Sequence, residues 1–123
     1  MAKCLIVDDV DVTKFSTGLI LKDMGVESDV AGNVQEAISA LGSNTYDVVI
    51  LDWCIGKDSG IDLLKRMRLD LGVRSPVIVL SGVMKQSSST EVTDAGGDAF
   101  IEKPATREKL QSVLQRFITI NPQ

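Results

Sequence analysis

Five side chains that can do chemistry each follow a short apolar stretch of the chain. Three are carboxylates, one is a hydroxyl and one is an ammonium group, on Asp8, Asp9, Asp52, Ser81 and Lys103. Mg²⁺ prefers oxygen ligands such as carboxylates. Phosphoryl transfer needs positioning and positive charge more than covalent help from a protein, and Mg²⁺ together with an ammonium group would supply that charge. These residue types therefore indicate a site for Mg²⁺ and a phosphoryl group.

Two roles are open to Asp52 in such a site. It is either a metal ligand only, or the nucleophile that forms an aspartyl phosphate. Asp8 and Asp9 are adjacent, so their charges repel and a bound cation favours the ionisation of both. Taken singly, each of the five residues has an ordinary explanation as a helix cap or a solvated strand end. The phosphoryl site is indicated because each of the five residues comes directly after a predicted strand or close to its end.

The apolar stretches predict the strands that position these residues. Short β-branched runs are typical of strands that are buried on both faces of a parallel sheet. Such runs lie at 5–7, 48–51, 77–80 and 99–101, and a weaker strand is predicted at 27–31. Because the carboxyl ends of parallel strands share the edge where ligands bind, we expect the reactive residues to converge there.

Helical patterns separate the strands. Val12, Phe15 and Leu19 recur on one face of a first helix. Three later helices begin after side chains that can cap a helix N-terminus, namely Asn33, Ser59 and Thr106. Strands and helices thus alternate along the chain, which predicts an α/β fold with a five-stranded parallel sheet covered on both faces.

The segment between the last two strands is unusual. Its run of hydroxyl residues at 87–90 is poor helix material, because these side chains compete for backbone hydrogen bonds. Ser88 and Glu91 have capping-box spacing, so the helix is expected to begin late and to run for about two turns before Gly96. Two interpretations stay open: a soluble helix start with exposed serines, or a mobile surface that changes shape.

Composition narrows the class of protein. The 123 residues are expected to form one domain, 1–123, with 44% hydrophobic and 24% charged residues. A net charge of −4 argues against direct nucleic-acid binding, and no stretch approaches the roughly 18 apolar residues that span a membrane. The chain has no histidine, which excludes a Ser–His triad and a His-ligated zinc site. With two cysteines and no metal-ligand spacing, we expect reduced thiols and a cytoplasmic protein.

Several motifs together resemble one protein family. They are LIVDD at 5–9, VVILDW at 48–53, Gly60, VIVLSG at 77–82 and DAFIEKP at 98–104. With them the chain resembles a response-regulator receiver domain of two-component signalling, over essentially its whole length, in the stand-alone chemotaxis-Y-like form without an output domain. The resemblance implies a flavodoxin-like (βα)5 three-layer sandwich with strand order 2-1-3-4-5.

The resemblance also implies roles for the metal and acceptor residues. Asp52 corresponds to the phosphoacceptor and is also a metal ligand. Asp9 would bind Mg²⁺ directly, Asp8 largely through water, and the backbone carbonyl of Cys54 would be a further ligand. Lys103 would pair with the phosphoryl group, next to a peptide bond before Pro104 that is cis in many family members.

Further roles concern switching and partners. Ser81 corresponds to the switch hydroxyl and Phe100 to the switch aromatic, and Gly82 matches a small residue that leaves room for the phosphodonor. A sensor histidine kinase or a phosphotransfer protein would donate the phosphoryl group. Switching would then change the face formed by the fourth helix, fifth strand and fifth helix, which a downstream protein recognises. Such a receiver catalyses only its own phosphorylation and dephosphorylation, binds neither nucleic acid nor membrane, and is a monomer or weak dimer.

The chain departs from the family pattern at four positions, Cys54, Gly56, Val83 and Ala105. In the family, the residues at the positions of Cys54 and Val83 often tune the rate of dephosphorylation. The lifetime of the phosphoryl group therefore cannot be inferred from the resemblance. Two rival functions also stay open. One is a haloacid-dehalogenase-type phosphatase, which would need an acidic residue where Cys54 stands. The other is a receiver fold that has lost phosphorylation and acts only by docking.

Overall fold

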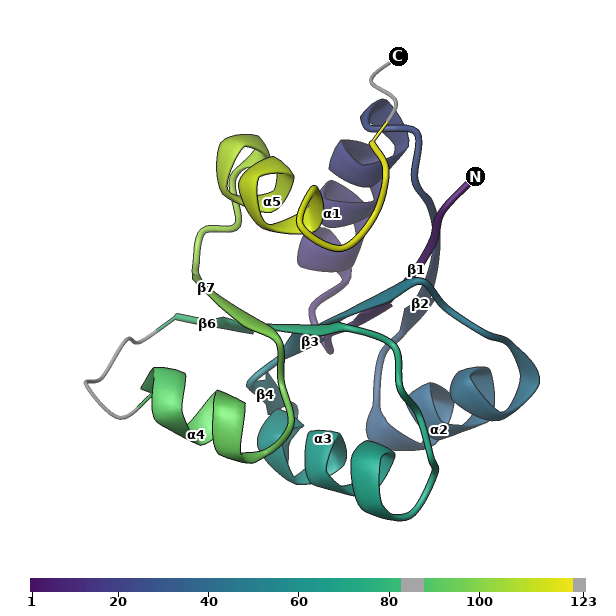
Figure 1. Ribbon diagram of the computed structural model, residues 1–123, viewed down its shortest axis with the longest axis vertical. Coiled ribbons are helices and arrows are strands. Elements are labelled where there is room, and N and C mark those ends of the chain that lie inside the picture. The colour runs from purple at the N-terminus through teal and green to yellow at the C-terminus, as the bar shows by residue number, and fades with distance from the viewer. Residues whose placement is uncertain (83–87, 121–123) are drawn as a thin grey trace.

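A parallel sheet forms the centre of the molecule. The computed structural model describes residues 1–82 and 88–120. Within them, five parallel strands form one sheet in the order β2-β1-β3-β6-β7 (Figure 1). The strand bounds are β1 Lys3–Val7, β2 Glu27–Ala31, β3 Val48–Asp52, β6 Val77–Ser81 and β7 Ala99–Glu102. Counted along the chain, this is the order 2-1-3-4-5, so the predicted fold class is confirmed.

Helices cover both faces of this sheet (Figure 1). On one face lie α1 (Asp11–Asp23) and α5 (Arg107–Leu114), and on the other lie α2 (Val34–Ser43), α3 (Gly60–Leu69) and α4 (Ser88–Asp94). A short antiparallel hairpin of β4 (Cys54–Ile55) and β5 (Asp58–Ser59) links β3 to α3. The sequence pattern does not predict this hairpin, because its strands are too short to show a period.

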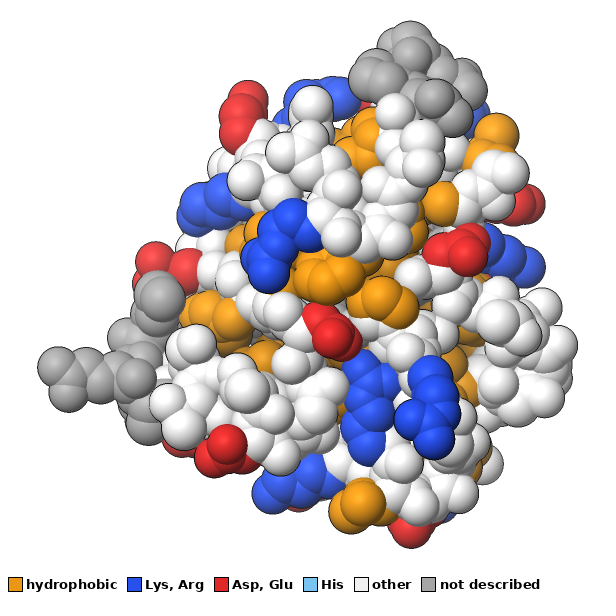
Figure 2. Space-filling view, in the orientation of Figure 1, with side chains coloured by type: hydrophobic (Ala, Val, Ile, Leu, Met, Phe, Trp, Pro, Cys, Tyr) orange, Lys and Arg blue, Asp and Glu red, His pale blue; other side chains and the backbone are white. Residues whose placement is uncertain are grey.

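The two helical layers explain why the strands show continuous apolar runs. Every side chain of β3 and of β6 is buried. Along β3, Val49 and Leu51 belong to the hydrophobic cluster on the side of α2, α3 and α4, whereas Val48 and Ile50 belong to the cluster on the side of α1 and α5. A strand covered on both faces has no solvent side, so its polarity does not alternate. Figure 2 shows hydrophobic side chains reaching this surface mainly between the two helical layers.

The register of the sheet brings the carboxyl ends of its strands level. Val7 of β1 pairs with Leu51 of β3, and Asp52 pairs with Leu80 of β6. Ser81, the last residue of β6, pairs with Glu102, the last residue of β7. The residues that follow these positions therefore lie at one edge of the sheet, as the sequence predicts.

Three predicted helix caps are present. In each, the cap oxygen accepts a hydrogen bond from the backbone N–H three residues later: Asn33 from Glu36 at 2.8 Å, Ser59 from Asp62 at 3.3 Å and Thr106 from Lys109 at 3.3 Å. Each bond satisfies a donor that the first turn of a helix leaves free. These side chains fix where α2, α3 and α5 begin.

The apolar face predicted for the first helix does not pack in the core. Val12, Phe15 and Leu19 do lie on α1, but they are 74%, 60% and 52% exposed. The helix instead buries Thr17 and Leu21 against the sheet. The periodicity is therefore correct for a helix, but the apolar stripe faces solvent because the opposite side of α1 fills the space beside β1.

Two helices end at other residues than the sequence pattern indicates, since the pattern ends the second helix at Gly42 and places Leu71 on the buried side of the third. α2 continues through Gly42 to Ser43, and α3 ends at Leu69, so that Leu71 lies outside the helix and is partly exposed. The described part of α4 runs from Ser88 to Asp94, directly after residues that the structure does not describe, so the late start of this helix stays a prediction. Val83 and the first part of the hydroxyl-rich segment, 85–87, lie outside the described residues.

Among the residues described, no helix is both long enough and apolar enough to cross a membrane.

Gly60 lets α3 approach the end of β3 closely. Its N–H donates a hydrogen bond of 2.7 Å to the carbonyl oxygen of Trp53. A Cβ atom at Gly60 would lie 2.0 Å from the carbonyl oxygen of Asp52, which is backbone and cannot rotate away. The absence of a side chain at Gly60 therefore allows the start of α3 to lie against the end of β3.

We predict that Gly60→Ala lowers the free energy of unfolding by about 2–3 kcal/mol, because overpacking against backbone forces a shift of the chain. Gly42→Ala is the matched control. A Cβ there meets nothing within 4 Å, so replacing a glycine within a helix should stabilise by about 0.5–1 kcal/mol. Urea unfolding of both variants measures the difference, and equal midpoints for Gly60→Ala and the wild type would contradict the prediction.

Candidate functional site

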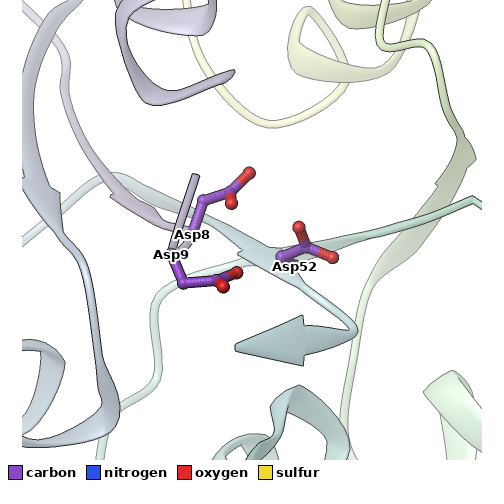
Figure 3. Close-up of side chains that lie close together, drawn as sticks. All are labelled: Asp8, Asp9 and Asp52. Atoms are coloured by element: carbon purple, nitrogen blue, oxygen red, sulfur yellow. The ribbon is translucent and has the colours of Figure 1, made fainter. Parts of the chain in front are cut away.

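Three carboxylates meet at the carboxyl edge of the sheet. Asp8 and Asp9 follow β1, and Asp52 ends β3. One oxygen from each lies within 4.8 Å of the other two, and Figure 3 shows all three carboxylates projecting into the same space. Asp8 and Asp52 are 2% and 5% exposed, whereas Asp9 is exposed. The site therefore has two buried carboxylates and one open to solvent.

Asp8 is the most constrained of the three. Its Oδ1 atom accepts a hydrogen bond of 2.9 Å from the Val10 N–H, while its buried Oδ2 atom has no hydrogen-bond partner among the described residues. Burial raises the pKa of the Asp8 carboxyl above its usual value; the Val10 N–H opposes this shift and the nearby charge of Asp52 adds to it. A buried oxygen without a donor is suited to a cation, and the set of oxygens present fits Mg²⁺.

Lys103 supplies positive charge to the same cluster. Its ammonium group forms an ion pair with the Oδ2 atom of Asp52, and the Oδ1 atom accepts a hydrogen bond of 3.2 Å from the Cys54 N–H. The backbone N–H of Lys103 donates to the Ser81 carbonyl oxygen at 2.7 Å, and the bond between Lys103 and Pro104 is cis. The end of β7 thereby holds the lysine over the end of β3.

A cavity of about 600 Å³ opens over these groups. Its lining includes six of the residues singled out from the sequence: Asp9, Asp52, Cys54, Ser81, Gly82 and Lys103. Ser81 is 8% exposed, whereas Cys54 is exposed and its thiol is free. Asp8 is not among the lining residues, although its carboxylate lies in the acidic cluster. The geometry therefore brings together three carboxylates that could hold a metal ion, an ammonium group and a hydroxyl around one cavity.

Phe100 lies outside that cavity. Its half-buried ring meets the ring of Trp53 edge to face, with centroids 6.2 Å apart. Phe100 also lines a second cavity of about 390 Å³ between β7 and α5, whose wall includes Glu108 and Lys109. Trp53 belongs to the first cavity, so the aromatic pair lies between the two.

Four further residues of the cavity wall had no predicted role in the site, namely Val10, Trp53, Ser88 and Glu91. Val10 follows the Asp8–Asp9 pair, so its place in the sequence could have indicated it. Ser88 and Glu91 come from α4, and their spacing indicates only a helix start. No local pattern tells which way a short helix is turned.

Comparison with known proteins identifies the family. The model of the response regulator receiver domain matches residues 4–115. The chain is 32% identical over 120 residues to the chemotaxis protein CheY-3 of Vibrio cholerae, and the match covers 93% of this chain and 92% of CheY-3. It is 33% identical over 119 residues to the transcriptional regulatory protein PmrA of Pectobacterium parmentieri. That match covers 97% of this chain and 53% of PmrA, so the chain spans about half of that regulator.

Solved structures agree with this match. Chemotaxis response regulator CheY4 of Vibrio cholerae superimposes with a TM-score of 0.86 at 28% identity, covering 96% of this chain and 99% of CheY4. The receiver domain of a sensor histidine kinase from Pseudomonas aeruginosa has the same fold, with a TM-score of 0.83 at 24% identity and coverage of 94% and 96%. That structure has a magnesium ion coordinated in its active-site cleft.

The sheet order, the acidic cluster and the family match lead to one assignment. The matched residues include all five strands of the sheet, apart from Lys3 at the start of β1, and every carboxylate of the cluster. The family is one of signalling proteins rather than conventional enzymes. The chain belongs to the response regulator receiver domain family of two-component signalling.

Proposed function

We propose that this chain is a switch that accepts a phosphoryl group from a phosphohistidine onto Asp52 with the help of Mg²⁺. The observation that carries the proposal is the meeting of Asp8, Asp9 and Asp52 within 4.8 Å, with Lys103 paired to Asp52. In the transfer, an oxygen of Asp52 attacks phosphorus and forms a P–O bond. The P–N bond of the donor breaks, and its electron pair stays on the imidazole nitrogen.

Four groups would hold the metal: the carboxylates of Asp8, Asp9 and Asp52 and the backbone carbonyl of Cys54. The support is the unpartnered oxygen of Asp8 and the proximity of the three carboxylates. When bound, Mg²⁺ supplies positive charge to the phosphoryl oxygens. It also relieves the repulsion among the carboxylates.

Three more residues position the phosphoryl group. Lys103 already faces Asp52, so its ammonium group can pair with a phosphoryl oxygen once Asp52 is phosphorylated. The Ser81 hydroxyl donates a hydrogen bond to another oxygen. A Cβ at Gly82 would meet nothing within 4 Å, so glycine leaves this part of the cavity open to the donor.

Switching would begin at Ser81 and Phe100. When Ser81 moves toward the phosphoryl group, it vacates space beside β7, and Phe100 turns inward from its contact with Trp53. The face formed by α4, β7 and α5 changes shape, and a downstream protein distinguishes the two states. A two-state equilibrium of this kind shifts only by the difference in free energy that phosphorylation makes between the states.

The exposed stripe of α1 supports docking of a helical phosphodonor. Val12, Phe15 and Leu19 are spaced along one side of the helix and are more than half exposed. The helix begins two residues after Asp9, and Val10 lines the cavity itself. A sensor histidine kinase or phosphotransfer protein that presents an apolar helical surface beside its phosphohistidine would cover this stripe while reaching Asp52.

The cellular compartment and the oligomeric state belong to the same proposal. We infer a single receiver domain over residues 1–123 that acts in the cytoplasm as a monomer or weak dimer. Cys4 and Cys54 are both free thiols, which suits a reducing compartment. The net charge of −4 suits a protein partner rather than nucleic acid.

Incubation with Mg²⁺ and a small phosphodonor such as phosphoramidate tests the proposal. Intact mass spectrometry should detect one phosphoryl adduct on the wild type and on Asp62→Ala, a surface control, but none on Asp52→Ala. Removal of Mg²⁺ with a chelator should abolish the adduct. A folded wild type that forms no adduct would favour a receiver that acts only by docking, and an adduct that persists in Asp52→Ala would exclude Asp52 as the acceptor.

The raised pKa of Asp8 gives a prediction for metal-free protein. A carboxyl whose pKa is higher in the folded state than in the unfolded state stabilises the fold at low pH, and this contribution is lost as the pH rises through the folded-state pKa. At pH 7, Asp8→Asn should therefore raise the free energy of unfolding by about 1 kcal/mol. The gain should shrink as the pH falls through the Asp8 pKa. Asp58→Asn, which removes an exposed carboxylate outside the cluster, is the matched control.

Adding Mg²⁺ should make the wild type more stable to unfolding than Asp8→Asn. Binding to the folded state alone stabilises the wild type by mass action, whereas Asp8→Asn lacks a ligand and should gain far less. Trp53 is the one tryptophan of the chain and lines the cavity, so its fluorescence should report binding directly. A flat signal on adding Mg²⁺ to the wild type, or equal stabilisation of the two proteins, would contradict the proposed metal site.

A further inference from the structure

Helix α4 contributes a charged side chain to the phosphoryl cavity. Ser88 and Glu91 line the same cavity as Asp52 and Lys103. Ser88 is 4% exposed, whereas Glu91 is exposed and so lies toward the opening. The two are three residues apart and therefore share one side of the helix. The mouth of the cavity thus carries a carboxylate that the proposed phosphoryl chemistry does not use.

The packing of α4 fixes Glu91 in this position. Val92 and Ala95 are 2% and 5% exposed and belong to the hydrophobic cluster shared with α3. The N–H of Gly97 donates a hydrogen bond of 2.8 Å to the Val92 carbonyl oxygen. Rotating the helix to move Glu91 away would expose Val92, so position 91 stays on the cavity side of the helix.

The position of Glu91 matters because phosphodonors differ in the charge of their leaving group. In phosphoramidate or a phosphoimidazole, the nitrogen group is protonated before transfer. The P–N bond then breaks with its electron pair on nitrogen and a neutral amine or imidazole departs. In acetyl phosphate, the P–O bond breaks and acetate departs as an anion. A carboxylate at the mouth attracts the first kind of leaving group and repels the second, over a range of about 8 Å at physiological ionic strength.

We propose that Glu91 is a specificity-determining residue of the phosphoryl site, which favours donors with a protonated nitrogen leaving group over acyl phosphates. This inference rests on the proposed function and deepens it, because it names the class of donor that the site selects. Glu91 acts on the approach and departure of the leaving group. Asp52 remains the residue that bonds to phosphorus.

The test compares initial rates of adduct formation with phosphoramidate and with acetyl phosphate, at fixed Mg²⁺ and low ionic strength. The ratio of the phosphoramidate rate to the acetyl phosphate rate should fall about fivefold in Glu91→Gln, which is the upper range for a pair of exposed charges. Glu91→Lys should lower the ratio further. A high salt concentration should bring the wild type and Glu91→Gln closer together.

Asp94→Asn is the matched control, since it removes one negative charge from the exposed side of the same helix and Asp94 is not among the cavity-lining residues. Its ratio should equal that of the wild type. An unchanged ratio in both Glu91 variants, or an equal shift in Asp94→Asn, would overturn the inference while leaving phosphorylation of Asp52 intact. A wild type that forms no adduct with either donor would remove the proposed function and this inference together.

Discussion

The repulsion among three carboxylates at one edge of the sheet is the constraint on which the rest of this structure depends. Parallel strands with level ends place Asp8, Asp9 and Asp52 within 4.8 Å of one another, and Lys103 supplies one positive charge to Asp52. Two of the carboxylates are buried, where water screens their repulsion poorly. The hydrophobic layers on both faces of the sheet hold this arrangement in place, so folding itself brings the three carboxylates together at the edge of the sheet.

The same strand end connects Asp52 to the rest of the molecule. Trp53, the next residue after Asp52, donates its N–H to Leu80 of β6 and accepts a hydrogen bond from Gly60 of α3. Its ring meets Phe100 of β7. A change at Asp52 therefore reaches α3, β6 and β7 through one neighbouring residue, which gives the proposed switch a short physical route to the face of α4, β7 and α5.

Sequence reasoning succeeded where local chemistry decides the outcome. Continuous apolar runs identify strands that are covered on both faces, and level strand ends bring Asp52 and Lys103 together although 51 positions separate them. It identified α1 as a helix, but a stripe such as Val12, Phe15 and Leu19 does not tell which side of a helix packs inward, and here the stripe is exposed. It also missed Glu91 in the cavity wall, since the orientation of α4 is set by burial of Val92 against distant residues.

Chemical trapping of the phosphorylated residue tests the central claim most directly. Borohydride reduces an aspartyl phosphate to homoserine, so the protein is incubated with Mg²⁺ and phosphodonor, reduced, digested and sequenced by mass spectrometry. We expect homoserine at position 52 and nowhere else, and none when Mg²⁺ is withheld. Unmodified aspartate at position 52 in a sample that carries a phosphoryl adduct, or homoserine in place of another acidic residue, would contradict the account.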